Sequence, residues 1–259
     1  MQPIDVVIPV YGQTALFKKC LETLGTSSAP FNLYVVDDAT PNKDDASMIE
    51  VIAREHGAKF FRRKTNGGFA KTVNFGVQKG TSPFICLLNS DVMLRPDALE
   101  IMLKEFEDPS VGVVGPMLVF PSDSEWGSPG KIQHIGISFN IKGMPFHPFL
   151  GWPIDSERAV VRRDFLQAVT GACLMTRRSL WKSVNGMPEA YGRGTFEDIE
   201  YCIAVASHGK KIVCNPAANG IHYTGQSIER DQGYPIRENS KIFELRVGAY
   251  IRHDEYLIW

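Results

Sequence analysis

Short apolar runs alternate with segments of helical periodicity over residues 1–115. The runs have the length and composition of buried strands, and the apolar residues between them recur as on one face of a helix. Such alternation is typical of a parallel sheet whose strands are joined by crossover helices. The predicted strands cover residues 6–10, 33–36, 59–61, 84–88 and 111–114, and the predicted helices cover 14–24, 41–56, 68–79 and 96–106.

The pattern changes after Pro116. Residues 121–131 and 142–158 are rich in proline, glycine and serine, and long irregular segments inside a compact domain tend to be binding loops or lids. The stretch 135–141 between them is expected to be an exposed strand or a hairpin arm. Further on we expect ordered structure over 168–175, a helix over 179–184 and a second helix that begins near Phe196. A strand is expected over 211–214, followed by a turn at Asn215 and Pro216. The tail, 238–259, is expected to be an amphipathic helix.

Composition narrows the class of protein. The chain has 259 residues and a formal net charge of −1, which suits one large α/β domain or two small ones and argues against a broad nucleic-acid footprint. One of the short basic clusters at 62–64, 162–163 and 177–178 could still face a diphosphate. The five cysteines are widely spaced, without a Cys-x-x-Cys pair, which indicates reduced, buried thiols. No apolar run approaches the ~20 residues of a membrane span, so we expect a cytoplasmic protein that could dock on the inner face of a membrane.

The run 84–88 ends in the polar step Asn89-Ser90-Asp91. In an open α/β sheet, ligands bind at the carboxyl ends of the strands. Asp91 is therefore placed to hold a divalent cation against a phosphate-bearing ligand. Asn89 and Asp91 are also good turn formers, so a plain turn is the alternative.

Two further polar groups lie at strand ends or helix starts in the first half. Asp37 and Asp38 directly follow a predicted strand and could accept hydrogen bonds from a nucleoside, or form a turn with Thr40. The segment 66–68, Asn-Gly-Gly, precedes a helix, so its backbone could approach an anion closely and Lys71 could reach a phosphate. An ordinary loop-to-helix turn is the alternative.

The second half carries an acidic helix start and one isolated histidine. Glu197 and Asp198 open a predicted helix, where acidic residues commonly oppose the macrodipole. The alternative is a general base, because carboxylates this close together raise one another's pKa. His222 is expected in a polar loop with Gly225 and Ser227, where a structural role is the alternative to ligand binding.

The order of these segments is specific. They are Val7-Ile8-Pro9-Val10-Tyr11, Val35-Val36-Asp37-Asp38-Ala39-Thr40, Asn66-Gly67-Gly68-Phe69-Ala70, Leu88-Asn89-Ser90-Asp91, Gly171-Ala172-Cys173-Leu174-Met175, Phe196-Glu197-Asp198-Ile199-Glu200 and Ile221-His222-Tyr223. The set strongly resembles the family 2 glycosyltransferases of the GT-A fold, especially bacterial members related to rhamnosyltransferases, over residues 4–230. The resemblance implies an α/β, Rossmann-like fold with a mainly parallel central sheet flanked by helices.

The resemblance also implies a domain layout and a donor site. A GT-A domain would cover 1–237, with a nucleotide-binding half at 1–115, an acceptor-binding half at 116–237, and a helical tail at 238–259 that could lead to a further domain. The donor would be a UDP- or dTDP-linked sugar, and the acceptor a hydroxyl of a glycan or lipid-linked glycan in bacterial surface polysaccharide synthesis, with peripheral membrane or multidomain association. Asp37 would contact the nucleoside base. Residues expected at the donor are Pro9, Tyr11, Asp37, Asp38, Asn66, Gly68, Lys71, Asn89, Ser90, Gly171 and Ala172.

A metal and a base follow from the same resemblance. Asp91 would bind Mg²⁺ or Mn²⁺ across the diphosphate, with His222 near the metal. Asp198, beside Glu197, would be the catalytic base of an inverting transfer. Many family members carry Asp where this chain has Asn89, and an amide oxygen is a poorer ligand for a hard cation than a carboxylate.

Two other functions stay open. A nucleotide-sugar pyrophosphorylase would carry a Gly-rich, Arg-containing loop after the first strand, where this chain has Tyr11-Gly12-Gln13-Thr14. A non-catalytic module that binds a sugar nucleotide or a glycan is favoured by Asn89 and opposed by the intact Glu197-Asp198 pair. Release of pyrophosphate would identify the first function, and a lack of slow donor hydrolysis with Mn²⁺ would identify the second.

Overall fold

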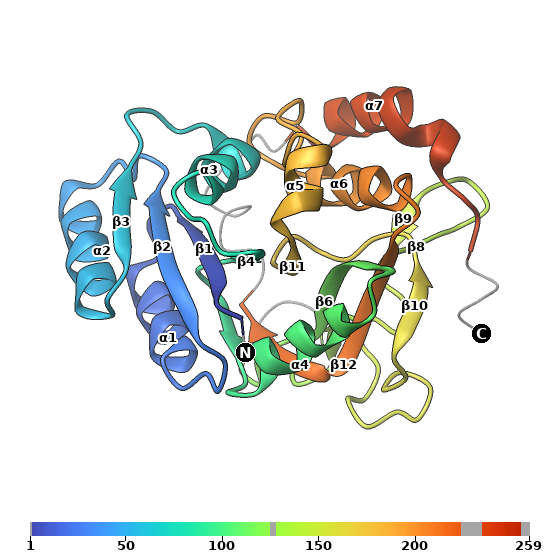
Figure 1. Ribbon diagram of the computed structural model, residues 1–259, viewed down its shortest axis with the longest axis horizontal. Helices are drawn as coiled ribbons and strands as arrows, with labels where there is room; N and C mark the ends of the chain where they lie inside the picture. The colour runs from blue at the N-terminus through green and yellow to red at the C-terminus, as the bar shows by residue number, and fades with distance from the viewer. Residues whose placement is uncertain (1, 125–127, 224–234, 255–259) are drawn as a thin grey trace.

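The computed structural model describes residues 2–124, 128–223 and 235–254. One large sheet runs through this part of the chain, with helices on both of its faces (Figure 1). Its strand order is β10-β12-β6-β11-β4-β1-β2-β3, with β5 added to β12 and β7 added to β6. A separate short hairpin joins β8 and β9.

The bounds of the elements are as follows. The strands are β1 (Ile4–Val10), β2 (Phe31–Asp37), β3 (Lys59–Arg62), β4 (Phe84–Leu88), β5 (Val92–Leu94), β6 (Val111–Val119), β7 (Ile132–His134), β8 (Ser138–Phe139), β9 (Pro145–Phe146), β10 (Arg163–Leu166), β11 (Cys173–Arg177) and β12 (Lys211–His222). The helices are α1 (Thr14–Leu24), α2 (Lys43–Glu55), α3 (Gly68–Val77), α4 (Ala98–Lys104), α5 (Arg178–Ser183), α6 (Glu197–Ala206) and α7 (Ile236–Val247), with short 3₁₀ turns η1 (Glu105–Glu107) and η2 (Gly248–Tyr250).

The sheet is mainly parallel, as predicted. Along the path, β3, β2, β1, β4, β6 and β12 point the same way, whereas β11 and β10 run against them. β11 lies between β4 and β6 and is antiparallel to both. Its first residue, Cys173, pairs with Leu88 at the end of β4. The segment just before β11 therefore arrives at the carboxyl edge of the parallel strands.

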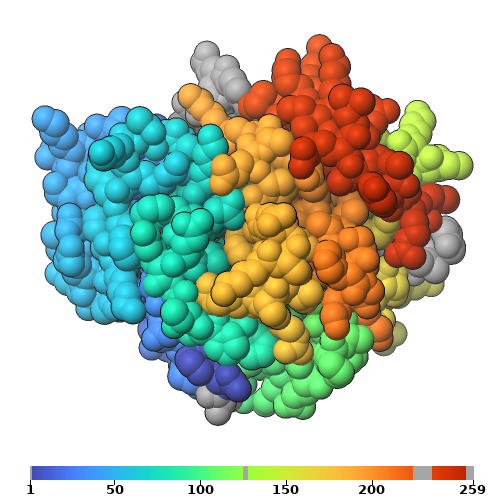
Figure 2. Space-filling view, turned by 45° about the horizontal axis from the view of Figure 1, so that its top comes forward, coloured from blue at the N-terminus to red at the C-terminus, as the bar shows by residue number. Residues whose placement is uncertain are grey.

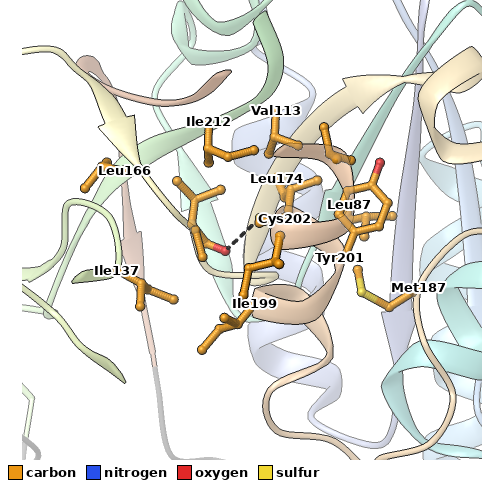
Figure 3. Packing of buried hydrophobic residues seen from close by; sticks show 14 of the residues in the cluster. Leu87, Val113, Ile137, Leu166, Leu174, Met187, Ile199, Tyr201, Cys202 and Ile212 are labelled. Carbon is orange, nitrogen blue, oxygen red and sulfur yellow. Dashed lines mark hydrogen bonds between the residues drawn. The ribbon is translucent and has the colours of Figure 1, made fainter. Parts of the chain in front are cut away.

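Two apolar clusters cover the two faces of the sheet. Successive residues of a strand point to opposite faces, and Leu87 of β4 belongs to one cluster while Leu88 belongs to the other. Residues of α3, α5, α6 and α7 pack on the Leu87 side, and residues of α1, α2 and α4 pack on the Leu88 side. Figure 3 shows the first cluster, in which Ile199, Tyr201 and Cys202 of α6 lie over the sheet.

The cysteines are structural, as the sequence predicts. All five lie in the described part of the chain, and each is buried and free of a disulfide. Figure 3 marks one of their contacts, in which the thiol of Cys202 donates to the carbonyl of Val169 at 3.8 Å. Burial raises the pKa of the Cys202 thiol well above its ordinary value, so these thiols act as small apolar side chains.

The first half of the chain follows the sequence prediction closely. The bounds of α1 and β4 coincide with the predicted helix 14–24 and strand 84–88. β2, β3 and α3 differ from their predicted bounds by one or two residues at an end. In the described residues, no helix has the length and apolar content needed to cross a membrane.

Three predictions for the second half are wrong in detail. β12 does not end at Cys214 but continues to His222, because a bulge in its pairing with β6, between Asn215 and Asn219, accommodates Pro216. His222 is therefore the end of a strand, and the residues Gly225 and Ser227 of the expected loop lie outside the described part. The stretch 135–141 is a hairpin arm but is mostly buried rather than exposed.

The arm β8 is buried because the tail covers it. Phe139 of β8 is fully buried and stacks with Phe243 of α7, at 6.5 Å between ring centroids. The tail is helical over α7 and η2 only, and from Ile251 to Asp254 it has no helical structure. The last five residues of the predicted tail helix lie outside the described residues.

A buried ion pair fastens the start of β1 to the start of α5. The Asp5 carboxylate is fully buried and accepts hydrogen bonds from the Arg178 guanidinium at 2.6 Å and from the backbone and hydroxyl of Ser82. A buried carboxylate that loses its cation keeps its desolvation cost without compensation.

We expect Arg178→Met to lower the free energy of unfolding by about 3 kcal/mol or more, measured by urea denaturation. The matched control is Arg54→Ala, which removes an exposed ion pair with Glu50 and should cost less than about 1 kcal/mol. Similar losses in both variants would contradict the assignment.

Candidate active site

A cavity of about 700 Å³ opens at the carboxyl edge of the parallel strands. Its wall combines residues that follow β1, β2 and β4 with the first residues of α3 and α6. Residues from both halves of the chain therefore meet in one space. The predicted site residues on its wall are Pro9, Tyr11, Asp38, Asn66, Gly68, Asn89, Ser90, Asp91, Gly171, Ala172, Glu197, Asp198 and His222.

Strand pairing brings Asp91 and His222 together. Asp91 precedes β5, and His222 ends β12, where it pairs with Val92 in the antiparallel ladder. The Nε2 atom of His222 lies 3.4 Å from Oδ1 of Asp91. Nδ1 of His222 lies 2.7 Å from the amide oxygen of Gln133, which can only accept, so Nδ1 carries a proton and Nε2 is the ring nitrogen that faces Asp91.

The turn before Asp91 also presents an unused acceptor. The backbone N–H of Asn89 donates to the carbonyl of Ala172 at 2.8 Å, which fixes the turn against the segment before β11. The side-chain Oδ1 of Asn89 is buried and has no hydrogen-bond partner. A buried oxygen without a donor, two residues from a carboxylate, fits a hard cation, which takes oxygen ligands.

The protein alone does not complete a metal shell. Within the described residues, no group of three or more His, Cys, Asp or Glu side chains could hold a metal ion. Asp91, His222 and the Asn89 amide would supply part of a shell, and phosphate and water oxygens would supply the rest, as is usual for Mg²⁺.

Asp198, also on the cavity wall, is held by backbone donors. It lies in the first turn of α6, where its Oδ2 accepts the N–H of Gly171 at 2.7 Å and its Oδ1 accepts the N–H of Ile199 at 2.8 Å. Burial raises the pKa of Asp198, and these N–H groups partly offset the rise. A side chain fixed at both oxygens has one orientation toward the cavity.

Glu197 is the more perturbed of the two acids. Its side chain is buried, and its Oε2 has no hydrogen-bond partner. Burial and the neighbouring Asp198 raise the pKa of Glu197 to about 8, which confirms the predicted direction of the mutual effect. The third acid of the motif, Glu200, instead accepts from Arg246 and from the Tyr191 hydroxyl and is structural.

Asp37 is not on the cavity wall, and its expected contact with a nucleoside base stays a prediction. Its carboxylate is fully buried, accepts from the backbone and hydroxyl of Thr40, and pairs with Arg62. Asp38 does line the cavity. It accepts from the backbone N–H groups of Gly67 and Gly68 at 3.0 and 2.9 Å, and so ties the glycine loop to the end of β2.

The glycine loop packs against protein rather than pointing its lysine at a ligand. Gly68 has φ +80°, and a Cβ there would lie 2.2 Å from the carbonyl oxygen of Gly192. Only glycine fits this close approach. Lys71 is exposed and is not among the wall residues, and its expected contact with a phosphate stays a prediction.

Sequence reasoning missed the basic residue on the wall. Arg193 is the only lysine or arginine among the described residues that line the cavity. Residues of the expected clusters do not line the cavity themselves: Arg62 pairs with Asp37, Arg162 with Glu105 and Arg178 with Asp5, while Arg63 pairs with the wall residue Asp38. The signal that could have found Arg193 is its place between two glycines just before the acidic pair.

Comparison with known proteins gives the family. The family model described as "Glycosyl transferase family 2" matches residues 5–183. The chain is 27% identical over 166 residues to the O-antigen biosynthesis protein RfbC of Myxococcus xanthus, covering 61% of this chain and 12% of that protein. It is 26% identical over 260 residues to the N-acetylglucosaminyl-diphospho-decaprenol L-rhamnosyltransferase of Mycobacterium tuberculosis, covering 92% of this chain and 81% of that protein.

Other relatives are longer than this chain. The chain spans 25% of the length of protein y4gI of Sinorhizobium fredii, to which it is 26% identical over 232 residues, or 86% of this chain. The chain thus matches only a small part of each of two long proteins, y4gI and RfbC.

Solved structures share the fold. The mannosyltransferase PcManGT from Pyrobaculum calidifontis, in complex with GDP-Man and Mn²⁺, superposes with a TM-score of 0.63 at 16% identity, over 93% of this chain and 61% of that one. GalNAc-T7 with UDP, GalNAc and Mn²⁺ superposes with a TM-score of 0.71 at 12% identity, over 96% of this chain and 50% of that one. From the match of its sequence and the architecture of its sheet, this chain belongs to glycosyl transferase family 2 and has the GT-A fold.

Proposed function

We propose that this chain is a metal-assisted inverting glycosyltransferase, which moves a sugar from a nucleoside-diphosphate sugar to a hydroxyl of a glycan or glycolipid. The observation that carries the proposal is that Asp91 and Asp198 line one cavity. One acid has a histidine beside it, and the other is fixed by two backbone donors. This is the arrangement that a cation site and a general base need on opposite sides of a bound donor.

Asp91, the Nε2 of His222 and the Oδ1 of Asn89 are the groups that would hold Mg²⁺ or Mn²⁺. When bound, the cation supplies positive charge next to the diphosphate of the donor. Arg193 adds a fixed charge on the same wall, where negative charge builds up as the nucleoside diphosphate leaves. Asp38, Pro9, Tyr11 and Asn66 line the part of the wall that we assign to the nucleoside.

Asp198 is the residue that would accept the proton of the acceptor hydroxyl. The hydroxyl oxygen forms a bond to the anomeric carbon as the bond from that carbon to the diphosphate oxygen breaks. Attack from the face opposite the leaving group inverts the anomeric configuration. The Gly171 and Ile199 N–H groups keep the Asp198 oxygens in place for this transfer.

Glu197 would act on the charge of the site. With a pKa of about 8, Glu197 is mostly protonated at neutral pH. When Glu197 is neutral, ionisation of Asp198 does not place two negative charges side by side in a buried site. Asp198 can therefore be the ionised member of the pair.

Donor and acceptor are inferred from the relatives. The N-acetylglucosaminyl-diphospho-decaprenol L-rhamnosyltransferase of M. tuberculosis supports transfer of a deoxyhexose to a lipid-linked glycan acceptor. RfbC supports a role in surface polysaccharide synthesis. A lipid-linked acceptor would place the reaction at the inner face of the membrane, with the chain in the cytoplasm.

We expect Asp198→Asn to lower the rate of sugar transfer by about 10²–10⁴-fold, because an amide cannot accept the proton. Donor affinity, measured by calorimetry, should change little. The matched control is Asp164→Asn, an exposed carboxylate of β10 away from the cavity wall, which should leave turnover intact. Unchanged turnover in Asp198→Asn would remove this residue from the role.

Asp91→Ala should weaken binding of UDP and dTDP in the presence of Mn²⁺, because it removes the carboxylate that lies beside His222. A thermal-shift titration with and without Mn²⁺ measures this, since ligands that bind the folded state raise its apparent stability. Asp97→Asn, which alters an exposed partner of Arg95, is the control. A Mn²⁺-dependent shift of equal size in wild type and Asp91→Ala would contradict the proposed metal site.

The acidic pair also predicts a pH dependence of stability. Glu197 has a folded-state pKa of about 8 against an ordinary value of 4.5, so the folded protein binds more protons than the unfolded chain between these values. Its contribution to stability therefore falls as pH rises through this window. We expect Glu197→Gln to be progressively more stable than wild type from pH 5 to pH 8 in urea unfolding without ligand. A stability difference that does not change with pH would contradict the shifted pKa.

A further inference from the structure

The loop 191–196, which leads into α6, has a strained backbone. It carries Arg193 and Thr195 to the cavity wall, and it ends directly before the acidic pair. Thr195 and Phe196 have φ of +86° and +71°, a region that L-residues rarely adopt and that costs about 1–3 kcal/mol for each residue. Such a conformation persists only where surrounding contacts enforce it.

Asn239 of α7 supplies those contacts. Its side chain is 3% exposed. Its Nδ2 donates to the carbonyls of Tyr191 and Gly194 at 2.9 and 2.7 Å, and lies 3.0 Å from the hydroxyl of Thr195. Because carbonyl oxygens only accept, the amide must turn its NH₂ group toward the loop. One buried side chain thus closes both ends of the strained turn.

Two more contacts fix α7 over α6. Arg246 forms a two-pronged pair with Glu200, which also accepts from the Tyr191 hydroxyl at 2.5 Å. Phe243 stacks on Phe196, with 5.0 Å between ring centroids. α7 lies beside α6 in the ribbon view and forms one continuous surface with it in the space-filling view (Figures 1 and 2). The family match ends before α7, so it assigns this helix no role.

We propose that Asn239 is a positioning residue, which holds the loop 191–196 in the strained form that sets Arg193 and Asp198 in the cavity. Asn239 acts through the loop, because it is not among the wall residues. The catalytic part of this inference rests on the proposed function, and the positioning part does not.

The test is Asn239→Asp, which keeps the shape of the side chain but replaces the donor with an oxygen. Loss of the donor to two buried carbonyls should release the loop from its strained form and lower kcat for sugar transfer about tenfold or more. The donor KM should change less than about threefold, because the nucleoside wall lies on other elements. A merely structural role would lower the amount of folded protein instead and leave kcat of the folded fraction intact.

Hydrogen exchange gives a readout that needs no substrate. Amides of residues 191–200 should exchange about tenfold faster or more in Asn239→Asp, while amides of β4 stay unchanged. The control is Ser240→Ala, whose hydroxyl bonds only within α7 to the Arg237 carbonyl and which should match wild type in both assays. Should wild type transfer no sugar at all, the proposed function fails while exchange still tests the positioning.

Two results would overturn the inference. One is exchange over 191–200 that is unchanged in Asn239→Asp, and the other is kcat within about threefold of wild type. If Asn239→Asp does not fold, the test uses Arg246→Met, which removes the contact of α7 with Glu200. Hydrogen exchange over 191–200 and kcat are then measured on that variant, and the same thresholds apply.

Discussion

The antiparallel pairing of β11 with β4 is the constraint on which the site depends. β4 delivers the turn with Asn89 and Asp91 to the carboxyl edge of the sheet, and β11 begins at that same edge because it runs the other way. Gly171, just before β11, then donates to Asp198. A parallel strand in this place would begin at the far edge and would leave Asp198 without that donor. One reversal of strand direction thus joins the turn of Asp91 and the helix start of Asp198, which are distant in sequence.

The backbone does most of the positioning at this edge. Asn89 is tied to Ala172 through main-chain atoms, Asp38 to the glycine loop, and Asp198 to Gly171 and Ile199. Backbone donors fixed by strands and helix starts do not reorganise when charge moves, which favours charge transfer in a site of this kind. Burial raises the pKa of both members of the acidic pair, and the N–H groups of Gly171 and Ile199 offset part of the rise for Asp198.

Much of this could be predicted from the sequence, for physical reasons. Helices and strands of the first half have strong periodicity and clear glycine stops, so their bounds were predicted closely. The family resemblance implied a cation at Asp91 and a base at Asp198 in one donor site, and both residues line the cavity. The sequence did not reveal the long-range partners of the other expected residues: Asp37 accepts from Thr40 and pairs with Arg62, and α3 turns Lys71 to solvent.

The parts that the sequence did not reveal depend on contacts between distant segments. The bulge that extends β12 to His222 requires the partner strand β6. The hydrogen bonds from Asn239 to the loop 191–196 join a residue of the tail to a loop whose sequence has no hydrophobic periodicity. The single polar residue on the buried face of α7 was visible in the sequence, but nothing there indicated which carbonyls it meets.

The most direct test is anomalous diffraction from a crystal of this protein grown with Mn²⁺ and a UDP- or dTDP-sugar. The account predicts a manganese peak within coordination distance of the Asp91 carboxylate and Nε2 of His222, with the anomeric carbon of the sugar on the side of the cavity where Asp198 lies. A manganese peak bound elsewhere, or a sugar whose anomeric carbon faces away from Asp198, would contradict it.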